Sequence, residues 1–365
     1  MNVYLDYAAT APMLPEVLEA LLPYYQTDFG NPDSLHAYGR RAAHAVLDAR
    51  DRIAAVLHVK PAEVYFTSGG TEADNWAVRG LGTGRALVSA IEHAAVLAAA
   101  PLREGGHAVI PAEKSGLVSL ESVEEGLKGG AGLVCLMAVN NETGAVQPVK
   151  ETAALCRAHG ALLFSDCVQA ACSQPLQEIC SHADAFSLSA HKIGGPKGVG
   201  ALIVKKGAAL SPLIAGGEQE RGLRGGTLNV AGVVGFAKAL EMAQADRERF
   251  CTHTKKLREL FETEILAALK GEVRVDGEDR APNISHITFE GGGASLVNVL
   301  DLKGVACSGG AACSAHAGLP SHVLLAMGRG EEAARRGVRF SFGLQTTEEE
   351  VIYAARTVIS LLRAK

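Results

Sequence analysis

The sequence lacks the features that mark several large classes of protein. No apolar run approaches the roughly 18 residues of a membrane span, and the opening residues lack the basic and apolar regions of a signal peptide. The 8 cysteines include no Cys-x-x-Cys pair, so neither a zinc-ribbon site nor a disulfide framework is expected in so long a chain. We therefore expect a cytoplasmic protein with no metal site and no membrane partner.

Nucleotide-binding loops and a large charge excess are absent too. The chain has no Gly-Lys pair and hence no Walker A loop, and Gly82-Thr83-Gly84 lacks the third glycine of a dinucleotide fingerprint. Its net charge of −5 gives no reason to expect nucleic acid as a direct partner. What the chain does have is length and apolar content: 365 residues, 48% of them hydrophobic, predict two domains around a large buried sheet.

Short apolar runs alternate with helical patterns through the first two thirds of the chain. This alternation predicts an α/β fold with a mostly parallel sheet that helices cover on both faces. The predicted strands are 86–89, 107–110, 133–139, 161–164, 185–188 and 199–204, and the predicted helices are 15–25, 38–57 and a long helical region, 230–269. A smaller unit follows, with a strand at 284–289, a helix at 294–300 and a terminal helix around 351–362.

Lys192 follows an apolar strand pattern, in Ser189-Ala-His-Lys192, and precedes a glycine-rich turn. Open α/β sheets place their ligands at such strand ends. Loss of hydration there would make the lysine amine a nucleophile able to form a Schiff base with a carbonyl group. By itself this pattern is more typical of a solvated surface lysine, so the prediction depends on what surrounds it.

Two further segments supply those surroundings. Asp166 ends a buried-strand pattern, and a carboxylate is what keeps a pyridine nitrogen protonated. Gly69-Gly70-Thr71 lies between a strand and a helix start, where free backbone N–H groups and the helix dipole favour a phosphate. Lysine, carboxylate and phosphate cup together predict pyridoxal 5'-phosphate (PLP), covalently bound to Lys192.

On these residues, on the segment that ends in Arg224-Gly-Gly-Thr227 and on the segment around Cys313, the chain resembles the cysteine desulfurases. These are the NifS/IscS-like group of the class V, fold-type I PLP enzymes. The resemblance covers nearly the whole chain. It implies a large PLP-binding domain at 12–247, with a mostly parallel seven-stranded sheet flanked by helices. A smaller C-terminal α/β domain, at 1–11 and 248–365, would carry the catalytic cysteine loop.

The resemblance also assigns residues to the site. Lys192, Cys313 and His93 would be catalytic, with His93 stacking on the cofactor ring and moving protons. Arg339 and Asn141 would hold the substrate carboxylate, because a guanidinium offers that group a bidentate fork. The cofactor contacts would be Gly70, Thr71, His93, Asn141, Asp166, Gln169, Ser189, His191, Lys192 and Thr227. Thr227 would reach the phosphate in a neighbouring subunit, which implies a homodimer with shared active sites.

The implied reaction converts L-cysteine to L-alanine and leaves its sulfur on Cys313 as a persulfide. A sulfur-acceptor protein would then take it up for iron–sulfur cluster or other sulfur-cofactor biosynthesis. Two alternatives stay open. A selenocysteine lyase or an aminotransferase of class V would share the cofactor residues, although an aminotransferase would not need Cys313. A non-catalytic PLP-binding scaffold in a sulfur-transfer complex would tolerate the loss of Lys192.

Overall fold

A computed structural model describes residues 1–290, 296–310 and 319–363. Its centre is a seven-stranded sheet in the order β2-β8-β7-β6-β5-β3-β4. The run from β4 to β7 is parallel, and β8 pairs antiparallel with both β7 and β2. The strands are β2 (Val64–Thr67), β3 (Ala86–Ser89), β4 (His107–Ile110), β5 (Leu133–Cys135), β6 (Leu162–Asp166), β7 (Ala185–Ser189) and β8 (Gly200–Val204). The predicted α/β fold with a mostly parallel sheet is confirmed.

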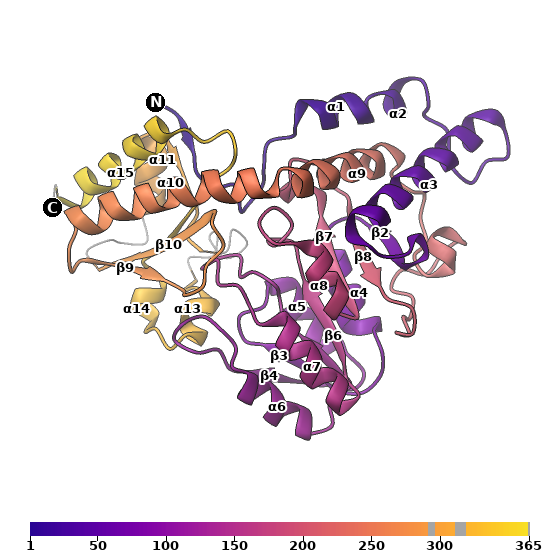
Figure 1. Cartoon of the computed structure of the whole chain (residues 1–365), viewed down its shortest axis with the longest axis horizontal. Coiled ribbons are helices and arrows are strands. Elements are labelled where there is room, and N and C mark those ends of the chain that lie inside the picture. The colour runs from indigo at the N-terminus through magenta and orange to yellow at the C-terminus, as the bar shows by residue number, and fades with distance from the viewer. Residues whose placement is uncertain (291–295, 311–318, 364–365) are drawn as a thin grey trace.

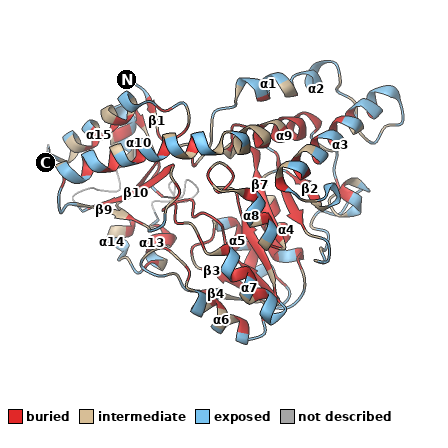
Figure 2. Cartoon of the chain, in the orientation of Figure 1, coloured by how far each residue is buried: buried red, intermediate tan, exposed pale blue. Residues whose placement is uncertain are grey.

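Helices cover both faces of this sheet (Figure 1). Alternate strand residues pack into two separate cores, because successive side chains of a strand point to opposite faces. One core contains α3 (Ala37–Leu57), α6 (Leu120–Lys128), α7 (Val149–His159), α8 (Leu176–His182) and α9 (Val230–Ala245). The other contains α4 (Gly70–Gly80) and α5 (Ala94–Ala99). Figure 2 shows most of the strands buried between these layers, apart from the edge strand β4, whereas the outer faces of the helices are exposed.

A long helix, α10 (Arg247–Ala268), leads from the large sheet to a smaller unit (Figure 1). Its antiparallel sheet has the order β12-β10-β9, with β9 (Val273–Asp276), β10 (Ile284–Phe289) and β12 (Gly337–Ser341). The remaining elements there are α11 (Leu296–Leu302), α13 (His322–Ala326), α14 (Glu331–Ala334) and α15 (Glu348–Arg363). At the N-terminus, β1 (Val3–Tyr4) pairs in parallel with β11 (Val305–Ala306). The domain boundaries at 12–247 and at 1–11 with 248–365 stay a prediction.

Most predicted elements agree with the structure to within one or two residues at each end, and three differ by more. The helix predicted at 15–25 is two, α1 (Pro15–Leu21) and α2 (Pro23–Gln26), because Pro23 has no N–H with which to continue the first. The region predicted as one helix at 230–269 breaks at Asp246, between α9 and α10. The strand predicted at 133–139 ends at Cys135, since the residues after it lead into a turn that begins at Asn140. Within the described residues, no helix combines the length and apolar character that a bilayer crossing needs.

The glycine-rich segment at 216–227, which suggests a flexible surface loop, is anchored by one buried carboxylate. Glu220 lies in a short 3-10 helix, η4 (Gln219–Gly222), and its side chain is fully buried. Both of its carboxylate oxygens accept from the Arg50 guanidinium, at 2.6 and 3.0 Å, and one also accepts from the Phe66 N–H. Glu220 and Arg221 have positive φ angles, of 47° and 61°, which are unfavourable for residues other than glycine. The buried hydrogen bonds of Glu220 offset this conformational cost.

Replacing Glu220 by alanine should therefore destabilise the large domain. It would leave the Arg50 guanidinium buried without its anion, which costs about 3–5 kcal/mol. Thermal unfolding of the cofactor-free protein should show a clearly lower midpoint for Glu220→Ala. Glu218→Ala, two residues away on an exposed side chain, is the matched control and should unfold like the wild type. Equal midpoints for the two variants would contradict this role.

Candidate active site

A cavity of about 240 Å³ lies at the carboxyl ends of the parallel strands. His93 follows β3, Asp166 ends β6 and Ser189 ends β7, so neighbouring strands deliver their polar residues to one edge of the sheet. The cavity brings together most of the predicted site residues: Gly70, His93, Asn141, Asp166, Gln169, Ser189, His191, Lys192 and Arg339. It also contains residues that sequence reasoning missed, namely Ala8, Ala9, Asp74, Met137 and Val168.

The Lys192 amine is held by the N-terminal segment of the chain. Its Nζ atom donates to the backbone carbonyls of Ala8, at 2.7 Å, and Ala9, at 2.9 Å. The side-chain amide of Gln169 donates to the same Ala8 carbonyl, at 2.8 Å. The backbone of this segment thus forms one wall of the cavity. Sequence motifs carry no signal for such a contact, because backbone carbonyls are common to all residues.

Asp166 is a buried carboxylate that needs a cation beside it. The side chain accepts from the Val168 N–H at 2.8 Å, and only 5% of the residue is exposed. Burial raises the pKa of Asp166, and the nearby His93 and Lys192 offset that rise only in part. A protonated pyridine ring in the cavity would supply the missing positive charge and favour the ionised carboxylate.

The two histidines of the cavity are neutral at pH 7. Burial, reinforced by Lys192, lowers the pKa of His93, although Asp166 opposes that shift. The Nδ1 atom of His93 accepts from the Ala95 N–H at 3.2 Å and caps α5, so the neutral ring carries its proton on Nε2. Burial also lowers the pKa of His191, to about 4, and its Nδ1 lies 3.2 Å from the Thr10 hydroxyl. Both rings can therefore form hydrogen bonds without adding charge.

The phosphate side of the cavity is the N-terminus of α4. Gly70 is the first residue of this helix and Thr71 the second, although Thr71 does not line the cavity itself. A Cβ atom on Gly70 would lie 2.9 Å from Cγ2 of Val168, so glycine keeps this corner open. Glu72 would repel an anion here, but Arg224 neutralises it through two hydrogen bonds, at 2.8 and 2.9 Å.

Thr227 lies apart from this group. It lines a different cavity of about 240 Å³, together with Tyr24, Tyr25 and Phe29 of the α2 region. Within one chain, therefore, the structure does not bring Thr227 to Lys192. This arrangement matches the expectation that Thr227 would serve a neighbouring subunit, which stays a prediction.

Arg339 and Asn141 form the opposite corner of the cavity. The Arg339 guanidinium is 2% exposed and donates to the Asn141 carbonyl, at 2.6 Å, and to Asp6 Oδ1, at 2.9 Å. Arg339 Nε and Asn141 Oδ1 are buried and find no hydrogen-bond partner among the described residues. A buried polar atom without a partner costs about 1–3 kcal/mol. A bound molecule with both acceptor and donor atoms would relieve that cost, as an amino acid does.

These features fit PLP. The cavity offers a lysine amine, a carboxylate that needs a cation, an uncrowded helix N-terminus for a phosphate and unsatisfied polar atoms for a second, smaller molecule. Among the described residues, no group of three or more His, Cys, Asp or Glu side chains is placed to hold a metal ion.

Cys313 lies outside the described residues, but the other seven cysteines are described and are free thiols. Burial raises the pKa of every one of them, and Cys307, the nearest in sequence to Cys313, is among these. None of the seven is therefore activated as a thiolate nucleophile, which requires a lowered pKa or an adjacent base.

Two further buried carboxyl groups lie near Asp166. Glu92 is fully buried and directly precedes His93; burial raises its pKa to about 8. Its Oε1 accepts from the Met137 N–H at 2.8 Å, and Oε2 has no partner among the described residues. Burial, followed by repulsion from Asp166, also raises the pKa of Asp74. Glu92 is therefore mostly protonated at neutral pH.

This shift predicts how stability changes with pH. Below pH about 4.5, Glu92 is protonated in both the folded and the unfolded protein and does not change the free energy of unfolding. Between about pH 4.5 and 8, Glu92 is ionised only in the unfolded protein. It therefore lowers the free energy of unfolding more and more as the pH rises through this window. Glu92→Gln keeps the acceptor for Met137 and removes this cost, which is on the order of several kcal/mol. The melting temperature of the cofactor-free variant, relative to wild type, should rise across this window. A constant difference, like that expected for the exposed Glu151→Gln, would refute the shift.

Comparison with known proteins agrees with this geometry. The family model described as Aminotransferase class-V matches residues 3–353. A Bacillus subtilis protein named "Putative cysteine desulfurase IscS 1" is 41% identical, over 99% of both chains, and the "Cysteine desulfurase IscS" of Methanosarcina thermophila is 39% identical, over 96% of this chain and 89% of that one. A solved structure titled "NIFS-LIKE PROTEIN" superposes with a TM-score of 0.90 at 33% identity, with both chains covered completely. The chain thus belongs to the class-V aminotransferase family and, within it, to the cysteine desulfurases, which are enzymes that hold PLP on a lysine.

Proposed function

We propose that this cavity removes the sulfur from L-cysteine, with Lys192 as the lysine that holds PLP and Cys313 as the residue that accepts the sulfur. The observation that carries the proposed site is the convergence of Lys192, Asp166 and His93 in one cavity with the unsatisfied Arg339 and Asn141 atoms. A solved relative titled "SspA in complex with cysteine", 32% identical with a TM-score of 0.81, supports the substrate; it covers 94% of this chain and all of its own.

Each proposed cofactor contact suits one chemical group of PLP. When bound, PLP supplies an electron sink that weakens the bonds at the substrate's α-carbon. Asp166 would keep the ring nitrogen protonated, and the amides of Gly70 and Thr71 at the start of α4 would hold the phosphate. Neutral His191 and the Ser189 hydroxyl would add hydrogen bonds without adding charge. The Gln169 amide donates one hydrogen to the Ala8 carbonyl and has a second hydrogen that would be donated to the phenolate oxygen of the cofactor.

Arg339 and Asn141 would bind the amino acid. Arg339 Nε is a buried donor that suits the substrate carboxylate, and Asn141 Oδ1 is a buried acceptor that suits its ammonium or thiol hydrogen. Asp6 and the Asn141 carbonyl fix the guanidinium from the other side. These two hydrogen bonds, one from each terminal nitrogen, hold the guanidinium in the position that faces the substrate.

Two groups would move protons. Lys192 Nζ would accept the α-proton of the substrate. The neutral His93 ring has its one basic lone pair at Nδ1, which accepts from the Ala95 N–H at 3.2 Å, so a proton taken by His93 arrives there and displaces that hydrogen bond. The lowered pKa of His93 keeps this lone pair available at neutral pH.

Cys313 would receive the sulfur as a thiolate. The thiolate attacks the substrate sulfur, the new S–S bond forms, and the C–S bond breaks with its electron pair remaining on the carbon side. Protonation of that carbon and return of a proton to the α-carbon then yield alanine and leave a persulfide on Cys313. The raised pKa values of the seven described cysteines support this choice, because none of them is a competing thiolate.

Cys313→Ala should abolish turnover of L-cysteine to alanine by several orders of magnitude, because it deletes a covalent step rather than weakening a contact. Binding of L-cysteine, followed by the change in cofactor absorption, should persist. Cys307→Ala is the matched control and should keep near-normal turnover. Mass spectrometry of wild type quenched during turnover should find one reducible extra sulfur on the Cys313 peptide. Full activity of Cys313→Ala, or a persulfide on Cys307, would disprove the assignment.

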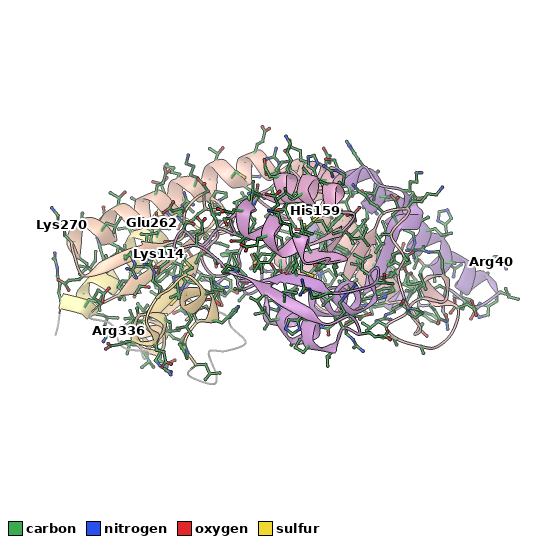
Figure 3. All side chains as sticks on the ribbon, turned by 90° about the horizontal axis from the view of Figure 1, so that it is seen from below. Arg40, Lys114, His159, Glu262, Lys270 and Arg336 are labelled. Atoms are coloured by element: carbon green, nitrogen blue, oxygen red, sulfur yellow. The ribbon has the colours of Figure 1, made fainter. Side chains whose placement is uncertain are left out.

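We further propose a homodimer with shared active sites. Large apolar side chains of the α2–α3 region are exposed: Tyr25 by 65%, Phe29 by 67%, Leu35 by 91% and Tyr38 by 48%. The cavity lined by Thr227 includes two of them, Tyr25 and Phe29. This patch lies towards the end of the molecule marked by Arg40, opposite the end marked by Lys270 (Figure 3). A second copy seated there would cover the apolar surface and receive Thr227 at its phosphate.

Phe29→Asp should shift the protein to a monomer, because it places an uncompensated charge in the covered patch. The monomer should lose PLP more readily, since the partner's phosphate contact is gone. Light scattering and cofactor retention on gel filtration measure the two effects. Leu302→Asp changes an equally apolar side chain, 84% exposed in the smaller unit, and should stay dimeric. A fully active Phe29→Asp monomer that keeps its cofactor would rule out sharing.

We place the reaction in the cytoplasm, where thiols stay reduced, and infer that the Cys313 persulfide passes to a sulfur-acceptor protein. The free state of the seven described cysteines supports a reducing compartment. The many relatives named cysteine desulfurase favour this enzyme over a class V aminotransferase, a selenocysteine lyase or a non-catalytic scaffold.

A further inference from the structure

A buried carboxylate next to the substrate corner has no part in the steps above. Glu142 is 0% exposed and follows Asn141 in a turn that begins at Asn140. The Asn140 side-chain carbonyl accepts from the N–H groups of Glu142, at 3.0 Å, and Thr143, at 2.9 Å. This side-chain bond fixes the turn, so that Asn141 lines the cavity while Glu142 is held alongside it. Burying a charge is costly unless it has partners, so what Glu142 contacts indicates why it is there.

Glu142 contacts residues on both sides of the segment that carries Cys313. The Ser321 hydroxyl, after that segment, donates to Glu142 Oε2 at 2.5 Å. Gly310, before it, lies so close that a Cβ atom would sit 2.9 Å from the same oxygen, and its φ of +83° is one that glycine adopts without strain. One carboxylate oxygen therefore meets the chain where it enters and where it leaves residues 311–318.

The other oxygen of Glu142 faces a histidine. Glu142 Oε1 makes no hydrogen bond among the described residues, and His322 Nδ1 lies 3.9 Å away. His322 Nε2 is 2.9 Å from the backbone carbonyl of Glu92, the residue before His93. Since a carbonyl only accepts, His322 carries a proton on Nε2, and this bond ties the outgoing side of the segment to the proton-handling residue.

The incoming side is tied to the substrate corner. Ser308 and Arg339 exchange two backbone hydrogen bonds, of 3.1 and 2.7 Å, and the Ser308 hydroxyl donates to the Gly310 carbonyl at 3.2 Å. Arg339 in turn donates to the carbonyl of Asn141, the neighbour of Glu142. The carboxylate-binding arginine, the turn at Asn140 and both flanks of the segment thus form one buried hydrogen-bonded network.

We propose that Glu142 is a positioning residue for sulfur transfer: through Ser321 and Gly310 it holds the flanks of the Cys313 segment against the substrate corner. The proposal rests on Cys313 being the sulfur acceptor. Fixing both flanks to one point reduces the conformations open to the intervening chain. It also raises the effective concentration of the Cys313 thiolate at the substrate sulfur, where a misplacement of about 1 Å can cost about 100-fold in rate.

The test separates substrate binding from sulfur transfer in the PLP-loaded enzyme. Glu142→Ala and Ser321→Ala should each lower the single-turnover rate of sulfur appearing on the Cys313 peptide by about 10- to 100-fold. Their Kd for L-cysteine, from the change in cofactor absorption, should stay within about threefold of wild type, because Arg339 and Asn141 remain. Glu142→Gln should restore most of the rate, since its amide oxygen still accepts from Ser321.

A control accounts for the second role of Ser321, which caps α13 by accepting from the Leu324 N–H at 3.1 Å. Ser119 caps α6 in the same way, from the Ser122 N–H at 3.2 Å, so Ser119→Ala loses a comparable cap and should transfer sulfur at the wild-type rate. A readout without cofactor or substrate is the rate of Cys313 alkylation in the cofactor-free protein. It should change by about threefold or more in Glu142→Ala and Ser321→Ala, but not in Ser119→Ala.

The outcomes distinguish this inference from the assignment on which it rests. If the wild type places no sulfur on Cys313, the acceptor assignment fails. If the wild type does so and Ser321→Ala transfers sulfur equally fast, the inference about Glu142 is wrong. If Glu142→Gln transfers sulfur as slowly as Glu142→Ala, the hydrogen bond from Ser321 is not what positions the segment. If the Kd for L-cysteine rises in parallel with the loss of rate, the variants have damaged substrate binding, and the inference is wrong. Ser321→Ala and Glu142→Gln keep the test decisive should Glu142→Ala fail to fold.

Discussion

The site depends on one physical constraint, the burial of the Asp166 carboxylate at the end of a central strand. Burial raises its pKa, so the ionised form persists only where positive charge is close. Lys192 lies near and meets that need in part. Backbone carbonyls hold Lys192 in place, and burial keeps His93 neutral. The cavity is therefore prepared for a cationic ring, which is what PLP presents when its nitrogen is protonated.

The site also depends on contacts between segments that are remote in sequence. Arg339 reaches the cavity from β12, yet Asp6 at the N-terminus and the Asn141 carbonyl near β5 hold its guanidinium. The same turn carries Glu142, whose carboxylate meets both flanks of the Cys313 segment. The proposed substrate corner and both flanks of the Cys313 segment thus belong to one hydrogen-bonded network. A buried network of this kind has few alternative arrangements, because each unsatisfied member would be costly.

Much of this could be predicted from local patterns. The buried strands Ala86–Ser89 and Ile284–Phe289 have the bounds that their sequence patterns predict, a short apolar run in the first and apolar residues interspersed with polar ones in the second. Lys192, Asp166 and Gly70 were recognisable since each follows a strand pattern or opens a helix. The helix breaks at Pro23 and Asp246 were not predicted. The helical pattern of apolar residues continues across Pro23, and the charged stretch around Asp246 includes no glycine or proline that would mark a break.

By itself, then, the sequence indicated which residues could carry the chemistry, because strand ends and glycine-rich turns are local patterns and a lysine, a carboxylate and a phosphate cup occur there together. Only the tertiary structure decided how those residues are held. The contacts of Lys192 with Ala8 and Ala9 and of Ser321 with Glu142, and the anchoring of the 216–227 segment by Glu220, join residues more than a hundred positions apart. No local pattern encodes such pairs, since they exist only after the sheet has brought its strand ends together and water has been excluded between them.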